Sequence, residues 1–256
     1  MSAENSLVVS LVTAAFNRER TIGQAVESVR HQTYPAIEHI IIDGGSRDNT
    51  VRIARAAARK GAIISSEPDD GIYDAFNKGV KRASGDVIGF VHSDDFLAAD
   101  DVIAKVVNAF ADPKVDAVYG DLDYVLADDP SRVLRRWRSG AFERRKLGRG
   151  WMPPHPALFL RRRIYERYGY FDTEFDIAAD YEFILRIFSQ PQFTASYINE
   201  TFVKMRIGGV SNKSLKNIVK KTSEDLRSLK RHNIGGIYAL FIKNLSKTGQ
   251  FINLRK

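Results

Sequence analysis

Short apolar runs alternate with amphipathic stretches over the first 120 residues of the chain. Five runs are rich in Ile, Val and Ala, which is typical of buried strands. They lie at 7–15, 38–42, 62–65, 86–91 and 115–119. The stretches between them carry apolar residues at helical spacing, and these predicted helices lie at 20–30, 48–59, 69–82 and 100–110. Strands that alternate with helices predict a doubly wound α/β sheet of mainly parallel strands.

The regular alternation ends after Gly120, and the rest of the chain has a looser pattern. Its apolar segments predict three strands, at 122–126, 133–137 and 157–160, of which the first two can pair. Helical spacing recurs at 162–168, 181–189 and 215–231. Because no repeat or low-complexity linker interrupts the sequence, we expect one domain over 1–212 and a helical C-terminal extension over 213–256.

Composition excludes several classes of function. The 256 residues contain no cysteine, which excludes disulfides, thiolate metal sites and a cysteine nucleophile. No apolar run reaches the roughly 18 residues that span a bilayer. The run at 6–16 is short and lacks a basic leader, so we interpret it as a buried strand rather than a signal peptide. We therefore expect a cytoplasmic protein.

The net charge of +8 belongs to the C-terminal extension. Residues 213–256 hold eleven Lys and Arg against two acidic residues, whereas 1–212 holds 28 basic and 29 acidic residues. A second basic cluster lies at 132–149. Such patches can bind nucleic acid or an anionic membrane, or can simply be a solvated surface.

Two adjacent carboxylates, Asp94 and Asp95, follow the predicted strand at 86–91. Open α/β sheets bind their ligands at the carboxyl ends of strands. Two neighbouring carboxylates repel each other unless a positive group lies beside them. A divalent cation that carries a phosphate group meets this requirement, because hard cations prefer oxygen ligands.

The ends of the first two strands carry further candidate residues. Thr13-Ala14-Ala15-Phe16-Asn17 closes the first strand, and Phe16 can stack on a nucleobase or pack in the core. Asp43 closes the second strand before Gly44-Gly45-Ser46, a turn that lets the backbone approach a ligand or that only precedes a helix cap. Neither a P-loop nor a Gly-x-Gly-x-x-Gly motif follows a strand.

The predicted helix at 69–82 begins in a polar segment. Its sequence is Ser66-Glu67-Pro68-Asp69-Asp70-Gly71-Ile72-Tyr73-Asp74-Ala75-Phe76-Asn77-Lys78-Gly79. A spacing of four residues pairs Asp74 with Lys78 and Tyr73 with Asn77 on the helix surface. This polar face suits a sugar or a phosphate, and the alternative for Asp74 and Lys78 is a surface ion pair. Three successive strand ends therefore direct polar side chains to one edge of the sheet.

Together these segments resemble inverting family 2 glycosyltransferases with the GT-A fold. The matching stretches are 12–17, 28–34, 41–50, 67–79 and 85–95. The run at 66–79 resembles the subgroup related to colanic-acid-type polysaccharide transferases. The resemblance implies a Rossmann-like, mostly parallel central sheet with helices on both faces. It also implies a nucleotide-sugar-binding half at 1–120 and an acceptor-binding half at 121–212, in an enzyme of bacterial surface polysaccharide synthesis.

The resemblance assigns the strand-end residues to a nucleotide-sugar donor. Asp95 matches the position that binds Mn²⁺ or Mg²⁺ on the diphosphate. Asp94 matches the position that contacts the ribose and supports the metal. The other implied donor-binding residues are Thr13, Ala14, Phe16, Asn17, Asp43, Glu67, Asp69, Asp74, Asn77, Lys78 and Ser93.

Two positions depart from the family pattern. His92 stands where many relatives have another acid, and it can be a weaker third ligand or a packed, hydrogen-bonded residue. Gly44 stands where many relatives have a second acid that contacts the uracil edge. A UDP-sugar is the favoured donor, and GDP- and dTDP-sugars stay open.

An inverting transferase needs a general base to deprotonate the acceptor hydroxyl. The segment at 175–183 resembles the acidic motif that precedes a helix in the family, which implies that Asp180 is the base. The alternative is that Asp180 only caps this helix. Asp176 and Glu182 are the rival bases.

Two further segments resemble substrate-binding parts of the family. Trp151 and His155 lie in a proline-rich segment that resembles the acceptor pocket, where Trp151 can stack on a sugar ring. The alternative is a stiff surface loop. The segment at 204–211 resembles a mobile loop of the family, so Arg206 is expected to approach the diphosphate unless it lies in an ordinary charged turn.

The predicted helix at 215–231 has two interpretations. Its apolar stripe consists of Leu215, Ile218, Val219, Leu226 and Leu229. The stripe can pack on the domain, or the basic helix can dock on the anionic inner face of the plasma membrane. Membrane docking would suit a lipid-linked acceptor, whereas packing is equally compatible with a free glycan.

Two other functions fit parts of the sequence. A non-catalytic sugar-nucleotide-binding relative is compatible with the departure at Gly44. A nucleic-acid-binding protein would act through the basic extension and show salt-dependent binding. We do not expect a nucleic-acid partner, because the acidic strand ends would repel phosphates in the absence of a metal.

Overall fold

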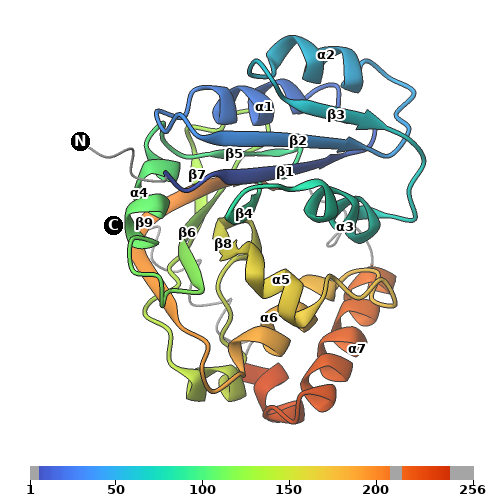
Figure 1. Cartoon of the computed structure of the whole chain (residues 1–256). Coiled ribbons are helices and arrows are strands. Elements are labelled where there is room, and N and C mark those ends of the chain that lie inside the picture. Colours follow the sequence, from blue (N-terminus) through green and yellow to red (C-terminus); the bar gives the residue numbers. More distant parts are fainter. Residues whose placement is uncertain (1–5, 208–214, 243–256) are drawn as a thin grey trace.

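The computed structural model describes residues 6–207 and 215–242. Within these residues the strands form one nine-stranded mixed sheet (Figure 1). The strand order is β3-β2-β1-β4-β8-β6-β9-β5, and β7 pairs with β6 outside this path. The strands are β1 (Val9–Ala15), β2 (Ile37–Asp43), β3 (Ile63–Ser66), β4 (Val87–Phe90), β5 (Asp95–Leu97), β6 (Ala117–Val125), β7 (Val133–Trp137), β8 (Leu158–Arg161) and β9 (Ala195–Arg206). The neighbours β3, β2, β1 and β4 are parallel, whereas β8 is antiparallel to both β4 and β6.

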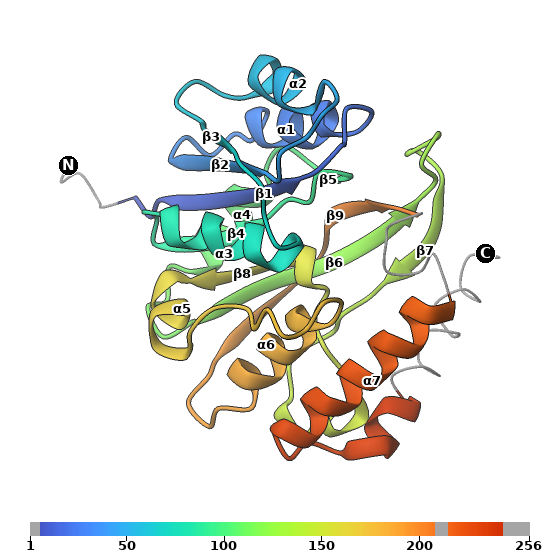
Figure 2. The same cartoon turned by 90° about the vertical axis from the view of Figure 1, so that its right-hand side faces the viewer.

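Helices cover both faces of the sheet (Figures 1 and 2). They are α1 (Ile22–Arg30), α2 (Thr50–Ala57), α3 (Ile72–Arg82), α4 (Val102–Ala109), α5 (Arg162–Tyr168), α6 (Ala179–Phe188) and α7 (Leu215–Arg231). Alternate residues of β1 enter different cores, as the two-residue period of a strand requires. Val12 packs with residues of α3 and α6, and Leu11 packs with residues of α1 and α4. The α/β class and the parallel first half predicted from the pattern are confirmed.

In the second half of the chain, the observed strands differ from the predicted strands. The segments at 115–119 and 122–126, expected as two strands, form the single strand β6. Gly120 lies inside β6, and a Cβ there would come within 2.5 Å of the Phe202 ring of β9, so this glycine permits close packing rather than a turn. The sequence pattern did not predict β5 or β9, because β5 has three residues and β9 alternates between polar and apolar positions without a continuous apolar run.

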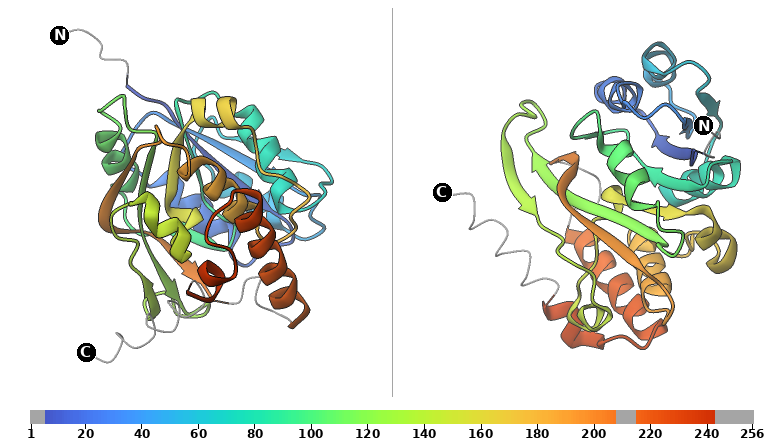
Figure 3. Two further views of the ribbon diagram at one scale, coloured as in Figure 1. Left: turned by 90° about the horizontal axis from the view of Figure 1, so that it is seen from below. Right: turned by 60° about the vertical axis from the view of Figure 1, so that its left-hand side comes forward.

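The C-terminal extension packs on the domain through α7, which lies beside α6 (Figure 3). Its buried face is largely polar and contains Glu224, Asp225 and Ser228 beside Leu229. Ile218 and Val219 of the predicted stripe are 48% and 69% exposed. The interpretation that the stripe packs on the domain is therefore wrong for these two residues. The Leu215 side chain, the segments 208–214 and 243–256, and with them most of the predicted mobile loop, lie outside the described residues.

The buried His39 in β2 makes stability depend on pH. Its Nε2 lies 3.1 Å from Oγ1 of Thr13. Burial lowers the pKa of His39 from 6.5 to about 3, and the charge of Arg59 contributes to the same shift. Between these values the unfolded chain binds a proton that the folded protein does not bind. Stability is therefore lost as the pH falls below about 6.5.

We expect that His39→Gln will flatten this dependence. Lowering the pH from 7 to 5 is predicted to remove roughly 2 kcal/mol from the free energy of unfolding through His39 alone. Denaturant titrations at the two pH values measure the difference for wild type, for His39→Gln and for the control His31→Gln, whose side chain is exposed. Equal pH slopes for wild type and His39→Gln would contradict the assignment.

Candidate active site

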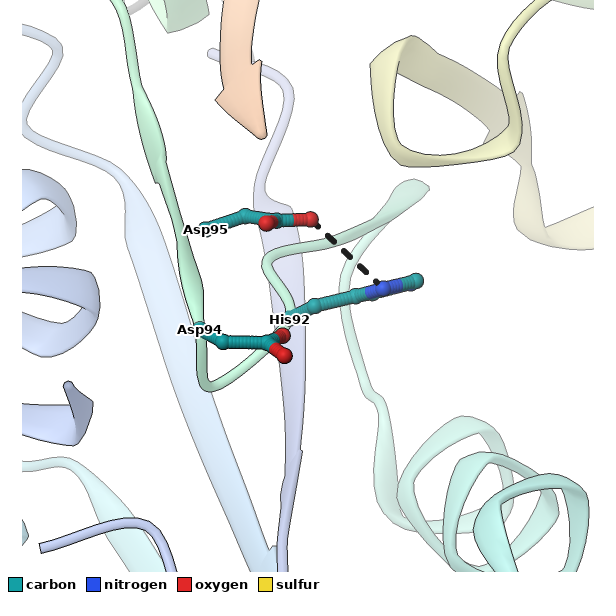
Figure 4. A group of neighbouring side chains, drawn as sticks. All are labelled: His92, Asp94 and Asp95. Carbon is teal, nitrogen blue, oxygen red and sulfur yellow. Dashed lines mark ion pairs between the residues drawn. The ribbon is translucent and has the colours of Figure 1, made fainter. Parts of the chain in front are cut away.

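Three potential metal ligands converge after β4 (Figure 4). One atom each from His92, Asp94 and Asp95 lies within 4.8 Å of the others. Nδ1 of His92 lies 3.7 Å from Oδ2 of Asp95. Asp95 is only 1% exposed, and among the described residues its Oδ2 has no hydrogen-bond partner. A buried carboxylate oxygen without a donor fits a cation better than it fits a packed structural role.

The electrostatics of this cluster also fit a cation. Burial raises the pKa of Asp95 well above its ordinary value, and the charge of Asp94 raises it further. Burial lowers the pKa of His92 against the opposing charges of Asp94 and Asp180, so the imidazole is neutral and able to coordinate. Arg206 offsets part of the negative charge, since its peptide N–H donates to Asp95 (3.2 Å) and its guanidinium donates to the Asp94 carbonyl (2.6 Å). The residues present therefore suit Mn²⁺ or Mg²⁺.

The ends of β1, β2 and β3 meet at one edge, as the parallel order predicts. Asp43 pairs in register with Ala15 on one side and with Ser66 on the other. The Asp43 carboxylate is buried and accepts hydrogen bonds from the Ser46 N–H (2.9 Å) and the Ser66 hydroxyl (2.7 Å). Asp43 therefore fixes the loop after β2, and its direct contact with a donor stays a prediction.

The first strand end presents an aromatic ring to solvent. Phe16 is 55% exposed, so the alternative that it packs in the core is wrong. Asn17 adopts a positive φ of 51° and accepts a hydrogen bond from the Arg47 N–H (3.0 Å), which joins this turn to the loop after β2. Thr13 and Ala14 are buried at the end of β1. The arrangement leaves the Phe16 ring free to stack on a planar ligand.

Asp69 occupies the space beside Gly44. A Cβ at Gly44 would lie 2.4 Å from Oδ2 of Asp69. Oδ1 of Asp69 accepts the Gly71 N–H at 3.0 Å. The carboxylate of Asp69 therefore stands next to the position where many relatives have their second acid, although it comes from a different loop. The sequence alone gave no signal for this proximity, because 25 residues separate the two positions.

The polar face of α3 divides into surface and buried groups. Asp74 and Lys78 form an ion pair of 3.0 Å, and Lys78 also donates to the Pro68 carbonyl (3.0 Å). Glu67 pairs with Arg82 at 3.3 Å. The buried Asn77 exchanges two hydrogen bonds with the backbone of Phe171, which ties α3 to the loop before α6. Donor contacts of these residues stay predictions.

Asp180 lies in the first turn of α6, close enough to His92 for its charge to affect the pKa of that imidazole. Its Oδ1 is 3.2 Å from the hydroxyl of Tyr73 in α3, and its charge raises the pKa values of His92 and His155 against the effect of burial. The N-cap of α6 is Ala178, without a side-chain hydrogen bond, so the alternative that Asp180 caps the helix is wrong. Tyr73 was known from the sequence only as a helix-face residue.

The two rival bases are engaged elsewhere. Glu182 is 1% exposed and forms an ion pair with Arg186 and a hydrogen bond of 2.9 Å with His232. Burial raises its pKa, but these hydrogen bonds outweigh burial and leave the pKa below its ordinary value. Asp176 is exposed and pairs with Lys220 of α7. Both rival acids are thus held in ion pairs, and the role of Asp180 as the base stays a prediction.

The predicted acceptor residues lie in different surroundings. His155 is buried beside His92, with ring centroids 5.7 Å apart, and burial lowers its pKa to about 4. Trp151 is half-buried, stacks on Phe142 and donates its indole N–H to the Ser139 carbonyl (2.8 Å). The alternative of a surface aromatic is wrong for Trp151, and its stacking on a sugar stays a prediction.

Two arginine side chains, Arg206 and Arg18, lie beside Asp94. Arg206 ends β9 and, with its guanidinium 5.0 Å from the Phe96 ring centroid, turns toward Asp94. Nε of Arg18 lies 4.0 Å from Oδ2 of Asp94. Arg18 was not predicted, and its signal in the sequence is its place directly after the first strand end. Ser93 is buried between the candidate ligands.

Comparisons with known proteins identify the family. The sequence profile of Glycosyl transferase family 2 matches residues 10–169. The chain is 39% identical over 186 residues to an uncharacterized glycosyltransferase of Mycobacterium tuberculosis, covering 70% of this chain and 68% of that protein. It is 30% identical over 212 residues to a PGL/p-HBAD biosynthesis glycosyltransferase of Mycobacterium bovis, covering 79% of this chain and 78% of that protein.

Solved structures share the fold. TarS 1–349 of Staphylococcus aureus in complex with UDP has a TM-score of 0.64 at 15% identity, over 96% of this chain and 71% of that chain. The mannosyltransferase PcManGT of Pyrobaculum calidifontis, in complex with GDP-Man and Mn²⁺, has a TM-score of 0.64 at 17% identity, over 96% and 73%. The chain thus has the GT-A fold, and its sequence match shows that it belongs to glycosyl transferase family 2 and is a glycosyltransferase.

Proposed function

We propose that this protein is an inverting, metal-dependent transferase that moves a sugar from a nucleoside-diphosphate sugar to a glycan or lipid-linked acceptor in bacterial surface polysaccharide synthesis. The observation that carries the proposal is the position of Asp180. Its carboxylate faces the cluster of His92, Asp94 and Asp95 closely enough for its charge to act on His92. A base on one side and a diphosphate-binding cluster on the other are the two requirements of a single displacement.

The acidic cluster would hold Mn²⁺ or Mg²⁺. Asp95 and Asp94 would supply oxygen ligands and the neutral His92 a nitrogen ligand. A bound metal neutralises the charge of the departing diphosphate. Arg206 and Arg18 add fixed positive charge beside Asp94, where the diphosphate would lie.

Asp180 would take the proton from the acceptor hydroxyl. The acceptor oxygen then forms a bond to the anomeric carbon while the bond from that carbon to the diphosphate oxygen breaks. The Tyr73 hydroxyl of α3 lies 2.8 Å from the Ile177 carbonyl and 3.2 Å from Oδ1 of Asp180. Its single proton can bind either oxygen, and when it binds Oδ1 it would orient the Asp180 carboxylate. His155 and His92 are kept neutral by burial, so they do not neutralise the base by forming an ion pair.

The position of Asp69 favours a nucleotide-sugar donor whose nucleobase carries a ring N–H. An ionised carboxylate only accepts hydrogen bonds, and one oxygen of Asp69 is already used by Gly71. Its Oδ2, beside Gly44, would accept the ring N–H that uracil, thymine and guanine present and that cytosine and adenine lack on the corresponding edge. The candidate donors are therefore UDP-, dTDP- and GDP-sugars, with Phe16 available to stack on the base.

The reaction itself tests the proposal. Purified full-length protein is incubated with Mn²⁺, each of the three classes of nucleotide sugar and a lipid-linked or oligosaccharide acceptor. The expected result is release of the nucleoside diphosphate together with a product whose anomeric configuration, measured by proton NMR, is opposite to that of the donor. A product with retained configuration would contradict the inverting mechanism.

The C-terminal extension would place the enzyme on an anionic membrane surface. The described helices contain no segment that is long and apolar enough to cross a bilayer. Instead, α7 exposes Ile218 and Val219 beside Lys220 and Lys221, and Phe241 further along is 63% exposed. Exposed apolar side chains with neighbouring lysines suit the interface of an anionic membrane, where a lipid-linked acceptor would reside.

Co-sedimentation with vesicles tests the membrane proposal. Wild type is expected to bind phosphatidylglycerol vesicles at low salt, and the double variant Ile218→Ser/Val219→Ser is expected to bind several-fold more weakly. The control is Val8→Ser, which changes an exposed apolar residue at the opposite end of the sequence. Equal sedimentation of all three proteins would contradict the membrane proposal and would not affect the transferase proposal.

A further inference from the structure

We infer that Glu224 of α7 is a positioning residue for Asp180, so that the C-terminal extension sets the geometry of the catalytic base. The inference rests on the proposed role of Asp180 in catalysis. The Glu224 carboxylate is occupied by backbone N–H groups rather than directed at a substrate. It acts on the backbone that enters α6, two to four residues before Asp180.

The Glu224 carboxylate binds three consecutive peptide N–H groups. Oε1 accepts the N–H of Asp176 at 3.2 Å, and Oε2 accepts those of Ile177 and Ala178 at 2.9 Å each. Glu224 is only 7% exposed, so these charge-assisted hydrogen bonds form away from bulk water. A carboxylate on consecutive N–H groups at the start of a helix is favoured by both the peptide dipoles and the helix dipole.

The local sequence cannot supply this contact. Ala178 is the N-cap of α6 and has no side chain that can accept a hydrogen bond. The sequence that enters the helix, Ile177-Ala178-Ala179, likewise offers no acceptor. The conformation of this turn therefore depends on an acceptor from elsewhere in the chain, and α7 provides it.

The peptide groups of Ile177 are held from both sides. Glu224 accepts the Ile177 N–H, while Tyr73 of α3 donates to the Ile177 carbonyl at 2.8 Å. The same Tyr73 hydroxyl lies 3.2 Å from Oδ1 of Asp180. The path from α7 to the Asp180 carboxylate thus passes through two residues, Ile177 and Tyr73. A displacement of about 1 Å in a catalytic group can lower the rate by roughly a hundredfold.

Other contacts keep α7 in place when Glu224 is changed. Arg227 lies with its guanidinium 3.8 Å from the Phe175 ring centroid and donates to the Glu174 carbonyl (2.8 Å). Arg231 pairs with Asp172 at 2.6 Å, and Leu229 is fully buried against the domain. Because these contacts do not involve the Glu224 carboxylate, Glu224→Gln should loosen the turn without detaching the helix.

Amide hydrogen exchange on the full-length protein tests the contact itself. In Glu224→Gln, the amides of 176–178 are expected to exchange at least tenfold faster than in wild type, while the central amides of α6 keep their protection. The control is Glu200→Gln, which removes an exposed carboxylate that pairs with Lys105. Unchanged exchange at 176–178 would overturn the inference, whether or not the protein transfers sugar.

Kinetics test the consequence for catalysis. Glu224→Gln is expected to lower kcat by ten- to a hundredfold with the donor KM within twofold of wild type. The same change in an Asp180→Ala background should produce no further loss, because the residue acts through Asp180. A merely structural role would instead lower the rate equally in both backgrounds. Absence of transfer by the wild type would contradict the proposed function and leave the exchange result to decide the role of Glu224 in holding the turn.

Discussion

Asp180→Asn is expected to lower kcat for sugar transfer by about 10³-fold, because the variant cannot accept the proton of the acceptor hydroxyl. The amide keeps the volume of the side chain and can still accept a hydrogen bond from Tyr73, 3.2 Å away in the wild type. The proposed donor site lies at the strand ends, so the Kd of the nucleoside diphosphate should stay within about twofold of wild type. Steady-state rates and isothermal titration measure the two quantities separately.

Asp176→Asn is the matched control for Asp180. It lies four residues earlier in the same segment, is exposed, and pairs with Lys220 rather than with the active site. This variant should retain near-wild-type turnover. If Asp180→Asn stays within threefold of wild type while Asp176→Asn loses activity, the base has been assigned to the wrong acid.

Asp95→Asn is expected to abolish metal-dependent nucleotide binding without lowering stability. In the metal-free protein the carboxylate is buried, its Oδ2 has no hydrogen-bond partner within 6–207 and 215–242, and it lies next to Asp94, so its charge is unfavourable for folding. Removing that charge should leave the unfolding temperature unchanged or raise it. Function should fall nevertheless, because the amide is a poor ligand for a divalent cation. A gain in stability with a loss of function is typical of a functional site.

Calorimetry and thermal unfolding check both halves of this prediction. Addition of EDTA to the wild type should weaken nucleotide binding to the level of Asp95→Asn. Asp101→Asn, which removes an acid that pairs with Lys105 on the surface, should bind as the wild type does. Retention of Mn²⁺-dependent binding by Asp95→Asn would show that the metal is held elsewhere.

The first half of the fold follows from the sequence because β1, β4 and most of β2 are buried on both faces. Runs rich in apolar residues, such as 7–15 and 38–42, predict these strands, and their parallel order brings Ala15 and Asp43 to the same edge. The acidic pair was equally predictable, since Asp94 and Asp95 follow the end of the buried strand β4 after three intervening residues. Here local pattern and tertiary structure agree.

Other features depend on contacts between distant segments. The polar residues Glu224, Asp225 and Ser228 in α7 have the pattern of a solvated helix face, yet they are buried. Glu224 is buried because it accepts hydrogen bonds from the backbone at 176–178. The hydrophobic Ile218 and Val219 are exposed for the converse reason, since no element covers them among the described residues. The proximity of Asp69 to Gly44 likewise follows from the packing of two loops. A single sequence carries no periodic signal for such pairs.

The most direct test of the central claim is a calorimetric titration of the wild-type protein with UDP, GDP, dTDP, ADP and CDP, each with Mn²⁺ and with EDTA. The claim is that the acidic edge binds a nucleoside diphosphate through a divalent cation. It predicts that at least one of UDP, GDP and dTDP binds with Mn²⁺, that EDTA weakens this binding at least tenfold, and that ADP and CDP bind poorly because their bases lack the ring N–H. Binding that is equally strong with EDTA, or no binding by any of the five nucleotides, would contradict it.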